Sequence, residues 1–334
     1  MFRALRLLVF FCFAGAAAFV VWLIALAAAP LQFPADSLEF SIVAGSSLRA
    51  ATRQIAEAGV PVSEAHFNLL ARITGKGTHI KAGSYELTRG ASSWELLRKI
   101  ALGDVLLSEA LFVEGWTFAQ MRAALDAISD MQHDTRGLSD AQIMERLGDA
   151  AGTPAEGMFF PDTYLFSKGE SDLKILARAH RLMRKTLELV WEERSEGLPY
   201  KTPYEALILA SIVEKETADP AERPTIAGVF SNRLRIGMRL QTDPTVIYGM
   251  GERFKGNIRK ADLERDTSFN TYTRAGLPPH PIAMPGLAAL RAAVNPAQTD
   301  ALYFVARGDG SHQFSRTLEE HNRAVARFQK KGRS

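Results

Sequence analysis

The hydrophobic pattern of this chain begins with one long unbroken run. From Leu7 to Ala29 every residue is apolar or small, and none is charged. A helix of that length rises by about 34 Å, enough to cross a bilayer core of about 30 Å. Arg3 and Arg6 precede the run, so the positive-inside rule predicts a cytoplasmic N-terminus and an extracytoplasmic remainder from Pro30 onward.

A cleaved signal peptide is the alternative interpretation of this run. Ala27-Ala28-Ala29 resembles the small-residue site at which such peptides are cut. The run is longer than the usual apolar region of about 7–15 residues, which favours a retained single-pass membrane anchor. A lipid anchor is not indicated, because Phe10 and Phe11 precede Cys12, where small residues would be expected.

Strand and helix periods alternate in the stretch that follows the apolar run. Segment 30–37 reads as a linker, and Gly103 ends the stretch. The predicted elements are a strand over 38–43, helices over 48–58 and 63–73, a strand over 83–87, and a helix from Ser92 or Ser93 to Leu102. This order predicts a small compact module over residues 38–103.

The rest of the chain, 104–334, predicts helices with scattered antiparallel strands. Helices are expected over 117–128, 139–147 and 172–193, along an apolar run from Leu207 to Thr217, and up to Gly237. The basic middle of 172–193 is typical of a solvated outer face. Segments 302–305 and 312–314 flank a turn at 307–310, and Thr317 opens a capping box for the last helix. The predicted fold class is therefore α+β.

Composition and charge narrow the class of protein. The net charge of +3 over 334 residues argues against a nucleic-acid partner, which usually requires a clustered basic face. Cys12 is the only cysteine, so the predicted exported part has no disulfide and no thiolate. The seven histidines show no metal-ligand spacing, and no Gly-x-Ser-x-Gly elbow or phosphate-binding Gly-Lys-Ser/Thr loop occurs. Neither a metal nor a cofactor is expected.

One glutamate, Glu214, stands inside the apolar helical run. Partial desolvation raises the pKa of a carboxyl, and a carboxyl that stays protonated can donate a proton to a glycosidic oxygen. Glu214 and Glu216 lie about 200° apart on a helix, so they cannot converge on one bond. Glu214 shares its face with Ala210 and Ser211, which predicts that Glu214 points inward and Glu216 outward. A surface helix end with solvated charges is the alternative that the spacing leaves open.

A polar stretch follows the helix that ends near Gly237. It is expected to be extended, and it offers hydrogen-bonding groups suited to sugar hydroxyls and acetamides, as does a later segment around Asn270. The candidates for binding a glycan here are Gln241, Asp243, Tyr248, Asn270 and Tyr272. Ordinary loops have the same composition, so the pattern by itself leaves both interpretations open.

A third group lies at 156–164, where a carboxylate stands beside aromatic residues. Glu156, Asp162 and Tyr164 are candidates for sugar contacts, with Phe159 and Phe160 as an exposed platform. A turn at the edge of the core would give the same pattern.

Two resemblances join these segments. Residues 38–103 resemble a LysM-like module, a fold that binds N-acetylated cell-wall sugars, although a spacer domain fits them equally well. The runs 210–217 and 233–249, with Tyr272, Gly276-Leu277-Pro278-Pro279, and Glu156-Gly157 followed by Pro161-Asp162-Thr163-Tyr164, closely resemble the endolytic murein transglycosylases, the MltG or YceG-like family. The anchor, the module and the catalytic domain stand in the order found in that family.

The resemblance implies a reaction, a site and a location. Members cut the β-1,4 bond between N-acetylmuramic acid and N-acetylglucosamine inside peptidoglycan strands, leaving 1,6-anhydro-N-acetylmuramic ends. The position matching the catalytic residue is Glu214, which would act as acid and then as base. The implied enzyme is a lyase of the cytoplasmic (inner) membrane that terminates nascent strands beside synthases (penicillin-binding proteins). The implied organisation is a cytoplasmic segment 1–6, a transmembrane helix 7–29, a linker 30–37, a module 38–103 and a catalytic domain 104–334 facing the periplasm.

Two other functions remain compatible with the residues. A lysozyme-like hydrolase would need a second carboxylate, which Asp243 or Glu156 could supply once the chain is folded. A membrane-tethered scaffold would bind glycan strands without cutting them.

Overall fold

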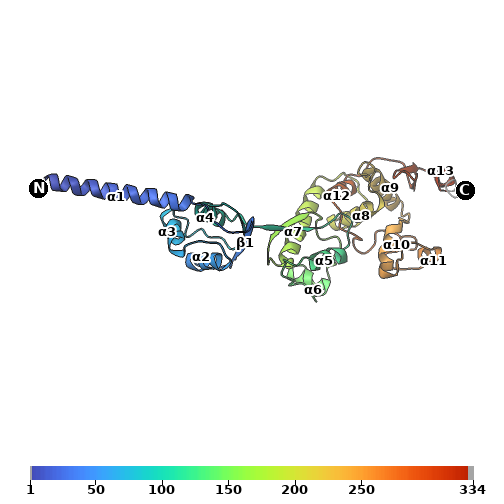
Figure 1. Cartoon of the computed structure of the whole chain (residues 1–334). Helices are drawn as coiled ribbons and strands as arrows, with labels where there is room; N and C mark the ends of the chain where they lie inside the picture. The colour runs from blue at the N-terminus through green and yellow to red at the C-terminus, as the bar shows by residue number, and fades with distance from the viewer. Residues whose placement is uncertain (1, 330–334) are drawn as a thin grey trace. The chain divides into compact units, whose positions relative to one another are not determined.

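The computed structural model describes residues 2–329 and divides the chain into two compact units. Unit 1 contains the described residues up to Ser108 together with Leu165–Gly169. Unit 2 contains Glu109–Tyr164 and the described residues from Glu170 onward. Helices and short two-stranded sheets make up both units, so the mixed α+β class predicted from the sequence is confirmed (Figure 1).

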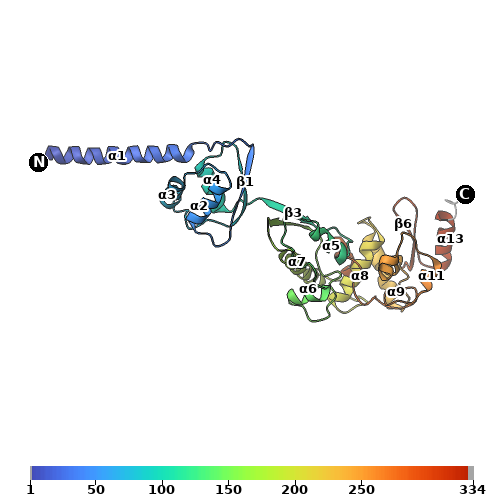
Figure 2. The same cartoon turned by 60° about the horizontal axis from the view of Figure 1, so that its bottom comes forward.

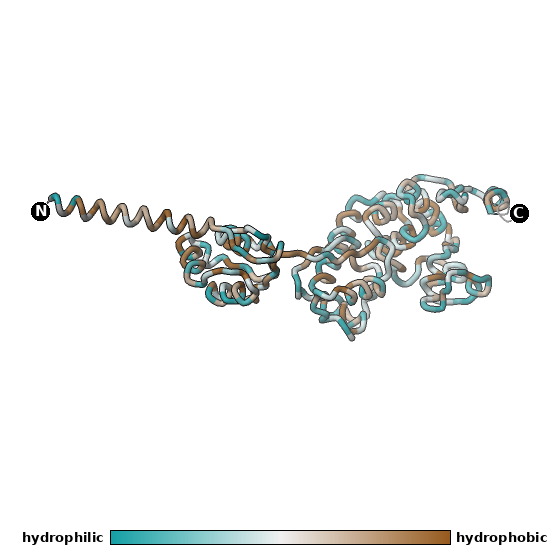
Figure 3. Tube along the Cα trace, viewed as in Figure 1, coloured by the Kyte–Doolittle hydropathy of each residue, from teal (hydrophilic) through white to brown (hydrophobic). Residues whose placement is uncertain are grey.

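Helix α1 (Phe2–Ala28) carries the apolar run (Figure 3). Its segment Leu5–Ala28 has a mean hydropathy of 2.7 and none of it is buried, so it is long and apolar enough to cross a membrane. A run of this kind in water would expose large side chains such as Phe10 and Phe13. The predicted helix is confirmed, and its role as an anchor is part of the proposal below.

Unit 1 has the predicted order of strand, helix, helix and strand. Its elements are β1 (Ser37–Ile42), α2 (Leu48–Glu57), α3 (Glu64–Ile73), β2 (Gly83–Thr88) and α4 (Ser93–Leu102). Strands β1 and β2 are antiparallel, with Phe40 opposite Tyr85 and their rings stacked 5.3 Å apart. The capping box of Ser92 and Glu95 starts α4, and Gly103 ends it in the left-handed conformation.

The segment predicted to be a linker is part of this unit. Leu31 and Phe33 are buried in the core of unit 1, and the Leu31 N–H donates to the Ala91 carbonyl at 2.9 Å. The prediction of a free linker over 30–37 is wrong at these positions, because two large apolar side chains gain more by burial than by exposure.

Unit 2 is built around helices α8 (Pro203–Glu216), α9 (Arg223–Arg235) and α12 (Leu287–Val294), which pack against one another. Every residue from Ala206 to Val213 is buried, so α8 is the central helix of this unit (Figure 2). Its start is set by Pro203 at the first turn and by the capping box of Thr202 and Glu205.

The other elements surround this centre. Strands β3 (Leu107–Leu111) and β4 (Thr163–Ser167) pair in a second sheet, and each runs across the limit between the units. The remaining elements are α5 (Phe118–Asp126), α6 (Asp140–Arg146), α7 (Asp172–Glu192), α10 (Asp243–Met250), η1 (Gly251–Arg253), α11 (Lys260–Glu264), β5 (Tyr303–Ala306), β6 (His312–Ser315) and α13 (Leu318–Phe328). The predicted β5–β6 hairpin and the capping box of Thr317 are both confirmed.

In unit 2 one sequence expectation is wrong, and one choice that the sequence left open is decided by burial. The polar stretch after Gly237 is not extended throughout, since α10 begins at Asp243, where Pro244 supplies the fixed φ of a first helical turn. Phe159 is not an exposed platform for sugars. It is fully buried and stacks on Phe118 at 4.7 Å, so the core-edge interpretation of this segment holds.

Gly228 in α9 gives a test of this packing. Alanine favours a helix by about 1 kcal/mol over glycine, yet a Cβ at Gly228 would lie 2.5 Å from the Ala297 carbonyl oxygen. We therefore expect Gly228→Ala to destabilise the protein by about 1–3 kcal/mol, measured by urea unfolding of the full chain in detergent. Gly249→Ala, where the nearest atom is the Thr267 hydroxyl at 3.0 Å, should cost less. A stabilised Gly228→Ala would contradict this packing.

Candidate functional site

The last turn of α8 carries two carboxylates that face different surroundings. The Glu214 side chain is 5% exposed, and both of its oxygens are engaged. Oε1 accepts a hydrogen bond from Arg223 at 2.9 Å, and Oε2 accepts one from the Gly286 N–H at 3.0 Å. Burial raises the pKa of Glu214, while the Gly286 N–H and the Arg223 charge oppose the rise.

Glu214 belongs to a small network of charged side chains. The Arg223 side chain is 8% exposed and also lies 3.9 Å from the carboxylate of Glu114. A Cβ at Gly286 would overlap that Glu114 carboxylate, so only glycine fits there without a shift of the side chain. The network ties α8 to the start of α9 and the start of α12, and Glu214 does not line either hollow described below.

Glu216 does not point into solvent, contrary to expectation. Its Oε1 accepts a hydrogen bond from the Thr242 hydroxyl, and its carboxyl lines a hollow of about 440 Å³. Burial raises the pKa of Glu216 to about 7, helped by the negative charge of Asp243 and opposed by Thr242, His312 and Arg233. The chain folds back here and covers the helix end with polar segments, which the periodicity of α8 alone does not reveal.

Three predicted binding residues gather in the hollow of Glu216. Gln241, Asp243 and Tyr272 all line it. The Tyr272 hydroxyl donates to Asp243 Oδ1 at 2.6 Å, and burial raises the pKa of Tyr272. Among the described residues other than glycine, Gln241 is the one with a positive φ, at +50°, a conformation that costs energy and is often found at functional sites.

A second hollow, of about 980 Å³, contains two other predicted residues, Glu156 and Tyr248. Glu156 is 8% exposed, and it accepts hydrogen bonds from the Phe118 N–H at 3.0 Å and from the Tyr248 hydroxyl at 3.1 Å. Burial raises the pKa of Glu156 to about 7. Lys215 also lines this hollow, whereas the next residue along α8, Glu216, lines the first one.

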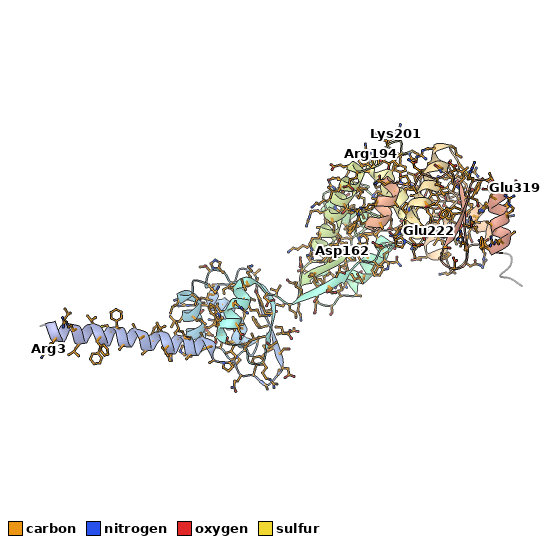
Figure 4. All side chains as sticks on the ribbon, turned by 90° about the horizontal axis from the view of Figure 1, so that it is seen from above. Arg3, Asp162, Arg194, Lys201, Glu222 and Glu319 are labelled. Carbon is orange, nitrogen blue, oxygen red and sulfur yellow. The ribbon has the colours of Figure 1, made fainter. Side chains whose placement is uncertain are left out.

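Three predicted residues are not placed to touch a glycan in either hollow. Asn270 is 1% exposed, and its amide bonds the carbonyls of the preceding loop and the Tyr272 N–H, so it holds that loop in shape. Tyr164 is buried and donates to the Phe160 carbonyl at 2.8 Å. Asp162 is exposed and accepts a hydrogen bond from the Thr163 N–H. In Figure 4 it lies on the opposite side of unit 2 from Glu319 of α13.

Sequence reasoning missed several groups near these carboxyls. Arg223, Glu114 and Gly286 come from three separate segments, and no local spacing links them to Glu214. His312 lines the hollow of Glu216 and is bound by Glu222, again from distant segments. A buried carboxyl needs a partner. The sequence signal that could have predicted the partner of Glu214 was Arg223, the first arginine after the end of α8. Within residues 2–329, no group of three or more His, Cys, Asp or Glu side chains could hold a metal ion.

Carboxyls with raised pKa values beside polar hollows define a class of site that can protonate a glycosidic oxygen. The sequence profile of the YceG-like family matches residues 40–327, and the chain belongs to this family. An endolytic murein transglycosylase of Bacillus subtilis (strain 168) is 31% identical over 309 residues, covering 87% of this chain and 85% of that protein.

Two further relatives agree with this assignment. An endolytic murein transglycosylase of Streptococcus pneumoniae (strain R6) is 30% identical over 283 residues, 75% of this chain and 51% of that protein. The chain thus spans about half the length of the pneumococcal relative. A crystal structure of a YceG-like protein from Listeria monocytogenes superposes with a TM-score of 0.52 at 29% identity, covering 86% of this chain and 98% of that one.

The raised pKa of Glu156 predicts a pH dependence of stability. Between about pH 4.5 and 7 the unfolded chain has lost this proton while the folded chain keeps it, so the free energy of unfolding falls as pH rises through that window. Glu156→Gln should remove about 3 kcal/mol of this fall, seen by urea unfolding at pH 5 and pH 8. The exposed Glu264→Gln should leave the pH dependence unchanged; equal slopes in all three proteins would contradict the buried state of Glu156.

Proposed function

We propose that this chain is an endolytic murein transglycosylase, which cuts the β-1,4 bond between N-acetylmuramic acid and N-acetylglucosamine within peptidoglycan strands. Membership of the YceG-like family over residues 40–327 supports the reaction class, as do the names of its relatives. The observation that carries the assignment of the site is a partly buried, protonatable carboxyl at the end of α8, Glu216, that opens onto a polar hollow.

The two carboxylates of α8 are unequal candidates for the proton donor. Sequence reasoning and the family resemblance named Glu214. Its oxygens, however, are held by Arg223 and Gly286, and a substrate would have to displace a buried ion pair to reach them. Glu216 opens onto a hollow that could admit a sugar and has a pKa near neutrality. We therefore assign Glu216 as the general acid and Glu214 as a positioning residue.

The reaction then follows from the state of Glu216. A protonated Glu216 donates to the leaving glycosidic oxygen, and the anomeric carbon gains oxocarbenium character. The acetamide of the muramyl residue assists from within the substrate. The C6 hydroxyl of the same sugar gives up its proton to a base as its oxygen closes onto the anomeric carbon, and the product ends in 1,6-anhydro-N-acetylmuramic acid.

Polar groups around the hollow would orient the sugar. Gln241, Asp243 and Tyr272 line the same hollow as Glu216 and offer amide, carboxylate and phenol groups to hydroxyls and acetamides. Glu156 and Tyr248, in the larger hollow on the Lys215 side, are proposed as contacts for a more distant part of the strand. The apolar residues of that hollow suit the acetamide methyl groups and the faces of sugar rings.

We assign the cellular setting on the same basis. Helix α1 would anchor the chain in the cytoplasmic membrane, with unit 2 outside the cytoplasm. The β1-α2-α3-β2 order of unit 1 supports a LysM-like module that binds the strand. An anchored, endolytic enzyme would meet nascent strands at the membrane, next to the synthases that extend them, and would terminate their elongation.

A lysozyme-like hydrolase is the second candidate, and one observation favours it. Asp243 lines the hollow of Glu216 and is close enough to raise its pKa, so two carboxyls face the same space. Hydrolysis with an acid and a second carboxylate would leave reducing ends with one added water. The names of the relatives favour the transglycosylase over this alternative.

The chemistry of the new glycan ends tests the function. Full-length protein in detergent, incubated with isolated sacculi, should release fragments with 1,6-anhydro ends that mass spectrometry identifies. Fragments with only hydrated ends would establish the hydrolase, and no fragments would leave a binding scaffold.

Variants of α8 test the assignment of the acid. We expect Glu216→Gln to lower kcat by at least about 100-fold with little change in stability, because the amide cannot supply the proton. Glu214→Gln should lower stability through the unpaired Arg223, by up to about 3–5 kcal/mol, and should retain some cleavage in the folded fraction. Glu205→Gln on the same helix keeps its capping box and should have no effect. Full activity of Glu216→Gln, with loss in Glu214→Gln, would reverse the assignment.

A further inference from the structure

A histidine bound by a carboxylate lines the hollow of Glu216. The Glu222 carboxylate accepts twice from His312, at 2.8 Å from the backbone N–H and at 2.7 Å from ring Nδ1. Both side chains are mostly buried, with 12% and 14% exposed. Two bonds from one residue to one carboxylate fix the ring, and a carboxylate at Nδ1 selects the tautomer that carries its proton there.

This tautomer leaves the other nitrogen, Nε2, unprotonated on the side of the ring away from Glu222. His312 lines the same hollow as Glu216, at the end of α8. The rings of Phe304 and Phe314 pack around the imidazole and restrict its other orientations. Nothing in the mechanism above uses this group.

We propose that His312, oriented by Glu222, is the base that takes the proton from the C6 hydroxyl as the anhydro ring closes. This inference rests on the proposed transglycosylase function and assigns its second proton transfer. Glu216 and His312 would then divide the acid and the base roles between two side chains of one hollow.

The proton and electron balance is complete without another reactant. The bond between the anomeric carbon and the leaving oxygen breaks, and that oxygen keeps the electron pair and takes the proton of Glu216. A lone pair of O6 forms the new bond to the anomeric carbon, and the O6 proton passes to Nε2 of His312. The enzyme is left with a carboxylate and an imidazolium, and proton exchange through solvent restores both.

Other charged groups also face this hollow. They are Asp243 of α10, Arg233 of α9 and His321 of α13, together with the phenols of Tyr272 and Tyr303. Arg233 is held by the carbonyls of Leu302 and Leu240, and Asp243 by Tyr272, so each already has a partner. His321 stacks on Tyr303 and has no carboxylate at its ring among the contacts described, which makes His312 the better oriented base.

The pH dependence of kcat separates this scheme from one in which Glu216 performs both transfers. A single carboxyl that must start protonated gives activity that falls only as pH rises. A base that must start without its proton adds a second fall on the acid side, and so gives a bell-shaped profile. We expect a bell-shaped profile of kcat against pH for the unaltered full-length protein acting on sacculi.

Two variants test whether His312 causes the fall of kcat at low pH, which is called the acid limb here. His312→Asn keeps an N–H donor near the position of Nδ1 for Glu222, and should lower kcat by about 100-fold, leave KM within about threefold and lose the acid limb. Glu222→Gln should lower kcat less and shift that limb, because the amide no longer selects the tautomer. Thermal melts of both variants serve as the control for folding.

The outcomes are distinguishable from failure of the proposed function. If His312→Asn folds, keeps kcat within about threefold and keeps the acid limb, the inference is overturned while the anhydro ends still establish the transglycosylase. If His312→Asn does not fold, the profile of Glu222→Gln decides, since an unshifted acid limb with unchanged kcat also overturns it. Loss of anhydro ends in the unaltered protein would overturn the proposed function itself.

Discussion

The structure of unit 2 depends on burying α8 on all sides while its last turn carries two carboxylates. A buried charge is tolerated only with a partner or with a raised pKa. The chain uses both solutions within three residues. Arg223 and the Gly286 N–H hold Glu214, whereas Glu216 is desolvated beside Thr242 and has a pKa near neutrality. One helix end therefore provides a fixed anchor for its neighbours and a titratable group for chemistry.

The two solutions reinforce each other physically. The Glu214–Arg223 pair and the contact with Gly286 hold the ends of α8, α9 and α12 together, so the position of Glu216 is set by packing and not by its own flexible side chain. Rigid support of this kind is what the proposed role of Glu216 requires, because a proton donor has to lie within hydrogen-bonding distance of the oxygen that it protonates. Glu216 stands at the junction of α8, the α9–α10 connection and the C-terminal hairpin, which together form its hollow.

Much of the architecture could be predicted from local patterns. The apolar run gave α1, the periodicities and Ser or Thr caps gave the helices of unit 1 and α13, and the Gly-rich turn gave the β5–β6 hairpin. These features depend on residues close together in the chain, and local propensity governs them. Errors at Leu31, Phe33 and Glu216 arose because distant segments cover these side chains. The helix start at Asp243 was missed although Pro244 gives a local signal for it.

The sequence by itself placed two carboxylates near the end of the apolar run that forms α8, a polar stretch after them, and an apolar helix near the N-terminus. Only the tertiary structure decided which of the two carboxylates is paired and which has a raised pKa beside a hollow. Whether a carboxyl is paired, free or protonated depends on the groups that other segments bring to it. The groups that decide this for Glu214 and Glu216 come later in the chain, at Arg223, Thr242 and His312. Helical spacing places Glu214 and Glu216 on different faces of α8, but the folded neighbours decide that Glu214 is paired with Arg223 and that the pKa of Glu216 is raised by desolvation.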